Sequence, residues 1–193
     1  MKKLLTLSLA AVAAFALQAD SMFRSDINCV KDQNELTVKS DNMKFDRQSW
    51  IKDKAVHKYT STAWTGKLGE DWQTVSYTVT PSKSGNININ MMGQWAKTAD
   101  TRGWVLVDNI KINGELAPNG DFKKTWKNKE GKVYPAHFWL NRKAQYIPDG
   151  GKDGSAAILV NHDNSGHYTL KNAEAGKAYT IQFTVKAAEA PMD

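Results

Sequence analysis

Short runs of alternating or β-branched residues recur about every ten residues along this chain, and turn signals separate them. The runs are ELTVKS at 35–40, WQTVSYTVT at 72–80, NININMM at 86–92, WVLVDNIKI at 104–112, SAAILVN at 155–161, HYTL at 167–170 and AYTIQFTVKA at 178–187. No long segment of 3.6-residue period follows residue 19, and only 52–60 is compatible with either a helical turn or a strand. The pattern predicts an all-β, two-sheet antiparallel β-sandwich and disfavours a βαβ fold.

Alternation also assigns the two faces of several predicted strands. In the last run the predicted core face holds Tyr179, Ile181, Phe183 and Val185. In the run at 72–80 it holds Gln73, Val75, Tyr77 and Val79. In the run at 86–92, Ile87, Ile89 and Met91 alternate with Asn86, Asn88 and Asn90. The asparagine row has two interpretations, an exposed strand face or a face that hydrogen-bonds the hydroxyl groups of a ligand.

Residues 1–19 have the features of a secretory signal peptide. Lys2 and Lys3 precede an apolar run at 4–17, and small residues follow it. The run is short for a membrane span, which argues against the alternative of a retained anchor. Asp26-Ile27-Asn28 before Cys29 is not a lipidation context. We therefore expect an exported protein in the periplasm, at the cell surface or outside the cell.

The charge and the cysteine count limit the functional classes. The formal charge is +6, which falls to +4 without Lys2 and Lys3, and this mild excess does not argue for nucleic acid. The densest basic cluster is Lys123, Lys124, Lys127, Lys129 and Lys132. It is either a solvated loop or a patch for anionic glycans or a cell surface. A single cysteine, Cys29, cannot form an internal disulfide and is expected to be a small buried apolar residue.

Several short motifs resemble the secreted galactose-binding-like jelly-roll modules of the carbohydrate-binding module superfamily. They are LAPNGDF at 116–122, PAHFW at 135–139, AGKAYTIQFTVKA at 175–187 and WVLVDNIKI at 104–112. In that family, a segment like NGDF usually opens the domain and one like DNI closes it. Here 72–115 resembles the closing half and 116–187 the opening half, so the order is permuted. The resemblance implies a jelly roll that binds carbohydrate.

Two arrangements follow from this order. Residues 20–193 can form one circularly permuted sandwich, because jelly-roll termini lie close together. Alternatively, 20–115 and 116–193 are incomplete units that pair with other chains. The second unit is short for an independent core and would leave exposed edges, so we favour the single domain. Residues 20–71 match no part of the family and are expected to add strands.

The resemblance also implies a structural Ca²⁺ near the opening and closing motifs. Asp108 and Asp121 are the matching positions, with Asn119 as a further oxygen donor. Calcium binds six to eight oxygen ligands of this kind. The alternative is ordinary turn chemistry, in which these side chains bind local backbone N–H groups.

Seven tryptophans are more than a sandwich core requires, and aromatic faces stack on sugar rings. Trp139 resembles a buried family position, and Trp72 and Trp104 begin strands and are expected inside the core or at its rim. The remaining four are Trp50, Trp64, Trp95 and Trp126.

Trp64, Trp95 and Trp126 are the predicted ligand-binding aromatics, with Gln94 and Arg102 as polar partners. Trp95 lies in a predicted loop between two strands, GQWAKTADTRGW. The family often builds its binding site in that loop.

Catalytic motifs are weak in this sequence. GxSxG, HExxH and a Gly-rich phosphate loop do not occur. HDNSGH at 162–167 is expected to be a solvated hairpin tip rather than a metal pair, because this spacing fixes no geometry. The leading hypothesis is an exported, non-catalytic carbohydrate-binding protein. The alternatives are an adhesive or structural protein of the cell envelope and a small hydrolase or lyase.

Overall fold

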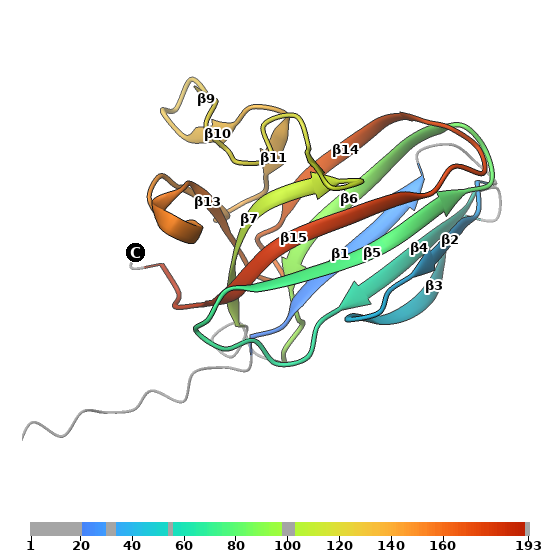
Figure 1. Cartoon of the computed structure of the whole chain (residues 1–193), viewed down its shortest axis with the longest axis horizontal. Coiled ribbons are helices and arrows are strands. Elements are labelled where there is room, and N and C mark those ends of the chain that lie inside the picture. The colour runs from blue at the N-terminus through green and yellow to red at the C-terminus, as the bar shows by residue number, and fades with distance from the viewer. Residues whose placement is uncertain (1–20, 30–33, 54–55, 98–102, 192–193) are drawn as a thin grey trace, which may run out of the picture.

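The computed structural model describes residues 21–29, 34–53, 56–97 and 103–191, and two antiparallel sheets pack face to face (Figure 1). Sheet A has the order β11 (Phe138–Leu140), β14 (Gly166–Ala173), β6 (Gly85–Gly93), β1 (Phe23–Cys29), β4 (Val56–Trp64) and β3 (Lys44–Asp53). Sheet B has the order β12 (Gln145–Ile147), β13 (Ala157–Val160), β7 (Trp104–Ile112), β15 (Tyr179–Ala188), β5 (Gln73–Pro81) and β2 (Leu36–Lys39), with β8 (Glu115–Leu116) also paired to β7. The all-β sandwich prediction is confirmed.

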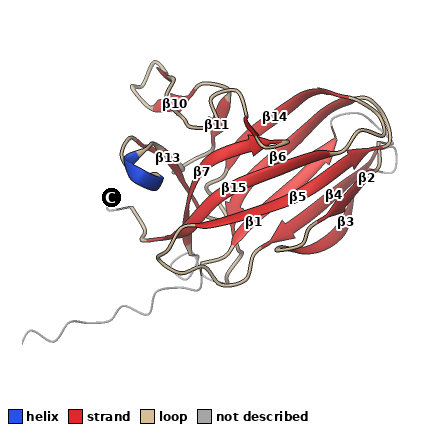
Figure 2. Ribbon diagram, in the orientation of Figure 1, coloured by secondary structure: helices blue, strands red, loops and turns tan. Residues whose placement is uncertain are grey.

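Smaller elements lie at one side of the sandwich. β9 (Thr125–Lys127) and β10 (Val133–Pro135) form a separate hairpin, and η2 (Lys152–Gly154) is a single 3₁₀ turn (Figure 2). Asn113 and Gly114, with φ of 52° and 86°, connect Ile112 to Glu115 in the tight β7–β8 hairpin, where two positive φ values are required. Every run that the sequence predicts as a strand forms one. β1, β3 and β4 are the added strands expected, without bounds, in residues 20–71, and β4 takes in much of the undecided run at 52–60; the sequence pattern did not predict β8 to β12.

Strands of residues 72–115 and of residues 116–187 lie side by side in both sheets. β15 pairs with both β5 and β7, and β14 pairs with β6. Residues 21–71 contribute β1, β3 and β4 to sheet A and β2 to sheet B. Strands of 116–187 therefore pair with strands of 72–115 in both sheets, and the permuted single domain stays a prediction.

The core lies between the sheets and follows the predicted faces. Tyr179, Ile181, Phe183 and Val185 are buried on β15, as are Val75, Tyr77 and Val79 on β5 and Ile87, Ile89 and Met91 on β6. The ring of Phe183 packs against Phe23 of sheet A at 5.0 Å and against Tyr77 at 5.8 Å. Gln73 is exposed, because the strand only enters the core after it.

One hydrogen bond crosses this apolar core. The hydroxyl groups of Ser25 on β1 and Tyr77 on β5 lie 3.0 Å apart, and both residues are buried. Burial raises the pKa of Tyr77 far above its ordinary value, so the hydroxyl stays protonated. Cys29, expected to be buried, is only partly buried against the core, and burial raises its pKa to about 11.

The predicted signal peptide lies outside the described residues. Within the described part of the chain, no helix has both the length and the apolar character needed to cross a bilayer.

Candidate functional site

Three aromatic rings form a stack beside the edge strand β11, and we call them the aromatic platform. The indole of Trp126 on β9 lies parallel to the ring of Tyr134 on β10, with centroids 4.7 Å apart and planes at 15°. Tyr134 in turn stacks on Trp139 of β11 at 5.0 Å and 18°. Tyr134 is only 4% exposed, whereas Trp126 is 43% and Trp139 53% exposed. Each indole therefore covers Tyr134 with one face and presents the rest of its surface to solvent.

The prediction that Trp139 belongs to the core is wrong. Phe138 and Leu140 flank it and are buried, so alternation along β11 turns Trp139 to the outer face of sheet A. Beneath the strand, Phe138 packs on Phe122 at 4.9 Å and on Tyr168 at 5.0 Å. These rings anchor the strand that carries the exposed indole.

Local hydrogen bonds hold the hairpin that supplies the other two rings. Asn128 Oδ1 accepts from the backbone N–H groups of Glu130 and Lys132 across the turn, and the register sets Tyr134 opposite Trp126. Lys132 Nζ lies 5.3 Å from the Tyr134 ring and donates to the carbonyl of Arg142. Lys132 thus links the hairpin to the chain that follows β11.

A row of polar side chains continues from the platform across the outer face of sheet A. Trp139 is the register partner of His167 on β14, and His167 is the partner of Asn90 on β6. Asn90 in turn pairs with Asp26 on β1, and Asp26 pairs with Thr62 on β4. We call His167, Asn90, Asp26 and Thr62 the polar row. Thr62 is fully buried, but His167, Asn90 and Asp26 are partly exposed, and cross-strand neighbours on one face lie within side-chain reach of each other, so an extended ligand can contact these three and the platform.

Hydrogen bonds fix the polar row. His167 Nδ1 lies 2.7 Å from Asn90 Oδ1, and Asp26 accepts from Thr62 Oγ1 at 2.8 Å and from two nitrogens of Arg24 at 2.8 Å each. A parallel set joins the predicted asparagine row to its neighbours: Asn88 Nδ2 donates to Asn28 Oδ1, and Asn88 Oδ1 accepts from Thr169. The asparagine face is therefore ordered and half-buried.

The bonding of His167 defines its tautomer. The Asn90 oxygen can only accept, so Nδ1 carries the proton and Nε2 accepts from Ser165 Oγ at 2.8 Å. Burial lowers the pKa of His167, which favours the neutral ring. Among the described residues, nothing binds Asn90 Nδ2, which leaves a fixed donor for a ligand.

Serine, histidine and asparagine in this order also resemble a nucleophile, a base and an orienting group. Ser165 is only 4% exposed, however, so its hydroxyl is enclosed by protein. We interpret this chain of bonds as the support that holds Asn90 in place.

The turn that precedes His167 differs from the predicted solvated tip. Asn161, Asn164 and Ser165 are buried, and Asn161 Oδ1 accepts from the backbone N–H groups of Asp163 and Asn164. The side-chain amide closes the turn from within, a role that sequence spacing does not reveal.

The predicted ligand-binding residues fall into two places. Trp126 belongs to the aromatic platform, whereas Trp64 ends β4 and Gln94 and Trp95 follow β6, where the Gln94 N–H donates to the Met22 carbonyl. Trp64 is the register partner of Arg24, which binds Asp26, so it lies on the outer face of sheet A two residues beyond Thr62 of the polar row. Trp95 is 55% exposed and Trp64 is half-buried. Arg102 lies outside the described residues.

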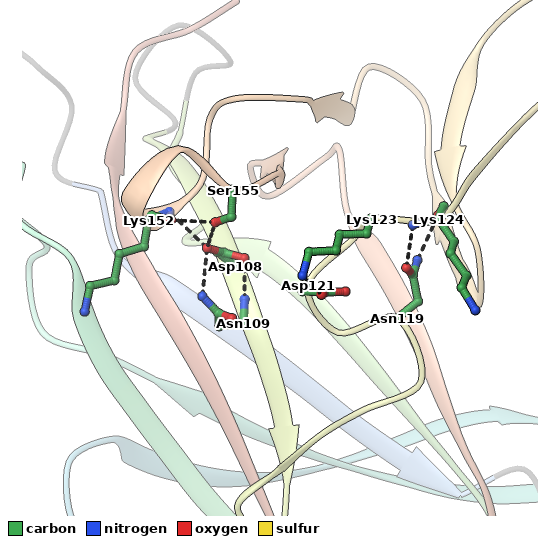
Figure 3. Close-up of polar contacts among 8 residues, drawn as sticks. All are labelled: Asp108, Asn109, Asn119, Asp121, Lys123, Lys124, Lys152 and Ser155. Atoms are coloured by element: carbon green, nitrogen blue, oxygen red, sulfur yellow. Dashed lines mark hydrogen bonds and ion pairs between the residues drawn. The ribbon is translucent and has the colours of Figure 1, made fainter.

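The three predicted calcium ligands are engaged in separate hydrogen-bonding groups (Figure 3). Asp108 is fully buried and accepts from the backbone and side-chain amides of Asn109, the backbone N–H of Lys152 and the hydroxyl of Ser155, at 2.6 to 2.9 Å. Asp121 pairs with Lys123 at 2.8 Å, and this pairing lowers the pKa of Asp121. Asn119 donates to the carbonyls of Lys124 and Ala136 and accepts from the Lys124 N–H.

Protein groups hydrogen-bond each of these side chains, an arrangement that accounts for them as turn anchors. Within the described residues, no three His, Cys, Asp or Glu side chains gather as a metal-binding group. The calcium site stays a prediction.

Comparisons with protein-family models, curated proteins and solved structures gave no match.

Proposed function

We propose that this chain is an exported, non-catalytic carbohydrate-binding protein whose ligand contacts the aromatic platform and the polar row. The observation that carries the proposal is the register of Trp139 with His167 and Asn90. An exposed indole offers a flat apolar face to the C–H groups of a sugar ring. The neighbouring fixed amide offers hydrogen bonds to its hydroxyl groups.

The binding test compares Trp139→Ala and Trp126→Ala with Trp95→Ala in a screen of polysaccharides and glycans, by isothermal titration calorimetry. We expect the two platform variants to weaken binding by about 1–3 kcal/mol, the scale of a lost stacking contact. Trp95→Ala removes an equally exposed indole that follows the end of β6 and is not part of the platform, so it should change affinity little. The opposite pattern, with the loss at Trp95, would place the ligand at the end of β6, whereas a loss at Trp64 would extend the site along β4 beside the polar row.

Two further readouts separate the remaining ideas. Thermal denaturation with Ca²⁺ and with a chelator tests the proposed structural calcium, which would raise the thermal stability when bound. The alternative function is adhesion, in which the exposed indoles bury at a protein interface. Self-association that rises with concentration, in a folded protein that binds no glycan, would favour adhesion.

A further inference from the structure

The positive charge of this protein is concentrated in one short segment. Residues 117–144, between β8 and β12, contain seven lysines and arginines against two acids, Asp121 and Glu130. Their formal charge of +5 accounts for nearly all of the +6 of the whole chain. The rest of the sequence, with 19 basic and 18 acidic residues, is almost neutral. We call residues 117–144 the basic segment.

The basic segment is also the segment that carries the aromatic platform. Trp126, Tyr134 and Trp139 all lie within it. Lys132 brings a positive charge directly to the stack, because its Nζ is 5.3 Å from the Tyr134 ring and is fixed by the carbonyl of Arg142. A ligand that lies on the platform therefore meets an ammonium group already held in position.

Other cations of this segment are available to a ligand. Lys124, Lys127 and Lys129 are exposed, and their side chains form no ion pair with any described residue. Lys123 differs, since Asp121 neutralises it. The acid nearest in the polar row, Asp26, is already paired with Arg24, so it adds no unbalanced negative charge to the face.

We propose that the ligand of the aromatic platform is an acidic polysaccharide, with carboxylate or sulfate groups on sugars that stack on Trp126 and Trp139. This inference rests on the proposed function and specifies its ligand. The indoles bind the sugar rings, and the lysines of the basic segment bind the anionic groups. Lys132 belongs to both groups, because it is a lysine of the basic segment and its Nζ lies beside the Tyr134 ring of the platform.

The test uses pairs of polymers that differ in charge: polygalacturonate and its fully methyl-esterified form, carboxymethyl and hydroxyethyl cellulose, and dextran sulfate and dextran. We expect the folded full chain to bind the acidic member of at least one pair. Raising NaCl from about 50 to about 500 mM should weaken that binding about tenfold. Trp139→Ala should weaken it as well.

Local charge is tested by a matched pair of double variants. Lys127→Gln with Lys129→Gln removes two charges from the basic segment, and Lys39→Gln with Lys83→Gln removes two exposed lysines elsewhere. Only the first should lower the affinity for the acidic polymer, by about tenfold. An equal loss of affinity in both double variants would mean that binding depends only on the net charge of the protein, which overturns the inference.

The other outcomes are also decisive. Equal affinity for neutral and acidic members overturns the acidic ligand and leaves the carbohydrate-binding function standing. Binding of no polymer by a protein with a cooperative thermal transition overturns both. Salt-sensitive binding that survives both tryptophan substitutions is ion exchange without a site, and it overturns the inference. Tighter binding to single-stranded DNA or to anionic phospholipid vesicles than to any polysaccharide also overturns the inference, in favour of another class of partner.

Discussion

The buried carboxylate of Asp108 holds the turn at 151–155 against β7. Its oxygens accept four hydrogen bonds, two of them from Lys152 and Ser155 on that turn. Gly151 makes this approach possible, because a Cβ atom there would lie 2.8 Å from Asp108 Oδ2 and 2.4 Å from Ser155 Oγ. At the scale of single residues, this buried and fully hydrogen-bonded carboxylate therefore supports a turn.

Replacing this carboxylate should be costly for stability. Asp108→Ala removes the common acceptor of four partly buried hydrogen bonds at once, and we expect a loss of about 3 kcal/mol in the free energy of unfolding. Urea denaturation followed by tryptophan fluorescence measures it. Asp121→Ala is the matched control, because its partner Lys123 is exposed and its removal should change stability little. A similar loss in both variants would contradict the anchoring role.

His167 makes stability depend on pH. Burial lowers its pKa in the folded protein below the ordinary value of 6.5, so the unfolded chain takes up a proton first as the pH falls. The stability contributed by the neutral ring is therefore present above about pH 6.5 and is lost below it. We expect His167→Gln to lose less stability than the native protein between about pH 7.5 and 5.0, measured by urea denaturation. Identical pH dependence in the two proteins would argue against this role.

At the scale of elements, β15 is the strand that joins the molecule. It pairs with β5 and β7 in sheet B and sends Phe183 across the core to Phe23 in sheet A. Phe183→Ala should cost about 3–5 kcal/mol in unfolding free energy, because it leaves a cavity between two rings. Gln182→Ala on the same strand faces away from the core and should cost less than about 0.5 kcal/mol. Thermal denaturation of both variants checks the difference.

Strands with a full alternating pattern could be predicted from the sequence, and shorter strands could not. β15 and β6 alternate over seven or more residues, so their buried faces were predicted correctly. β11 has only three residues, so the alternation of Phe138, Trp139 and Leu140 is too short to predict a strand. That pattern was the available signal for an outward-facing Trp139, and the resemblance to a buried family position outweighed it.

At the scale of the whole molecule, the candidate site depends on pairing between distant segments. Asp26, Asn90, His167 and Trp139 come from four strands spread over more than a hundred residues, and only the register of sheet A aligns them. The asparagine alternation predicted one member of the row, and the tryptophan count predicted a surplus of indoles. Neither indicates which strands become neighbours, because that depends on how both sheets close over a shared core.

The hydrogen bond between Ser25 and Tyr77 limits how the two sheets can lie on each other. Apolar side chains tolerate small slips, since a shifted contact costs only part of its dispersion energy. A slip here would instead leave a phenol and a hydroxyl in the core with no water to replace the lost partner. The pair therefore selects one alignment of sheet A over sheet B from the many that hydrophobicity alone would accept. In this protein the Ser25–Tyr77 contact therefore favours one alignment of the two sheets, while the surrounding apolar core stabilises the sandwich.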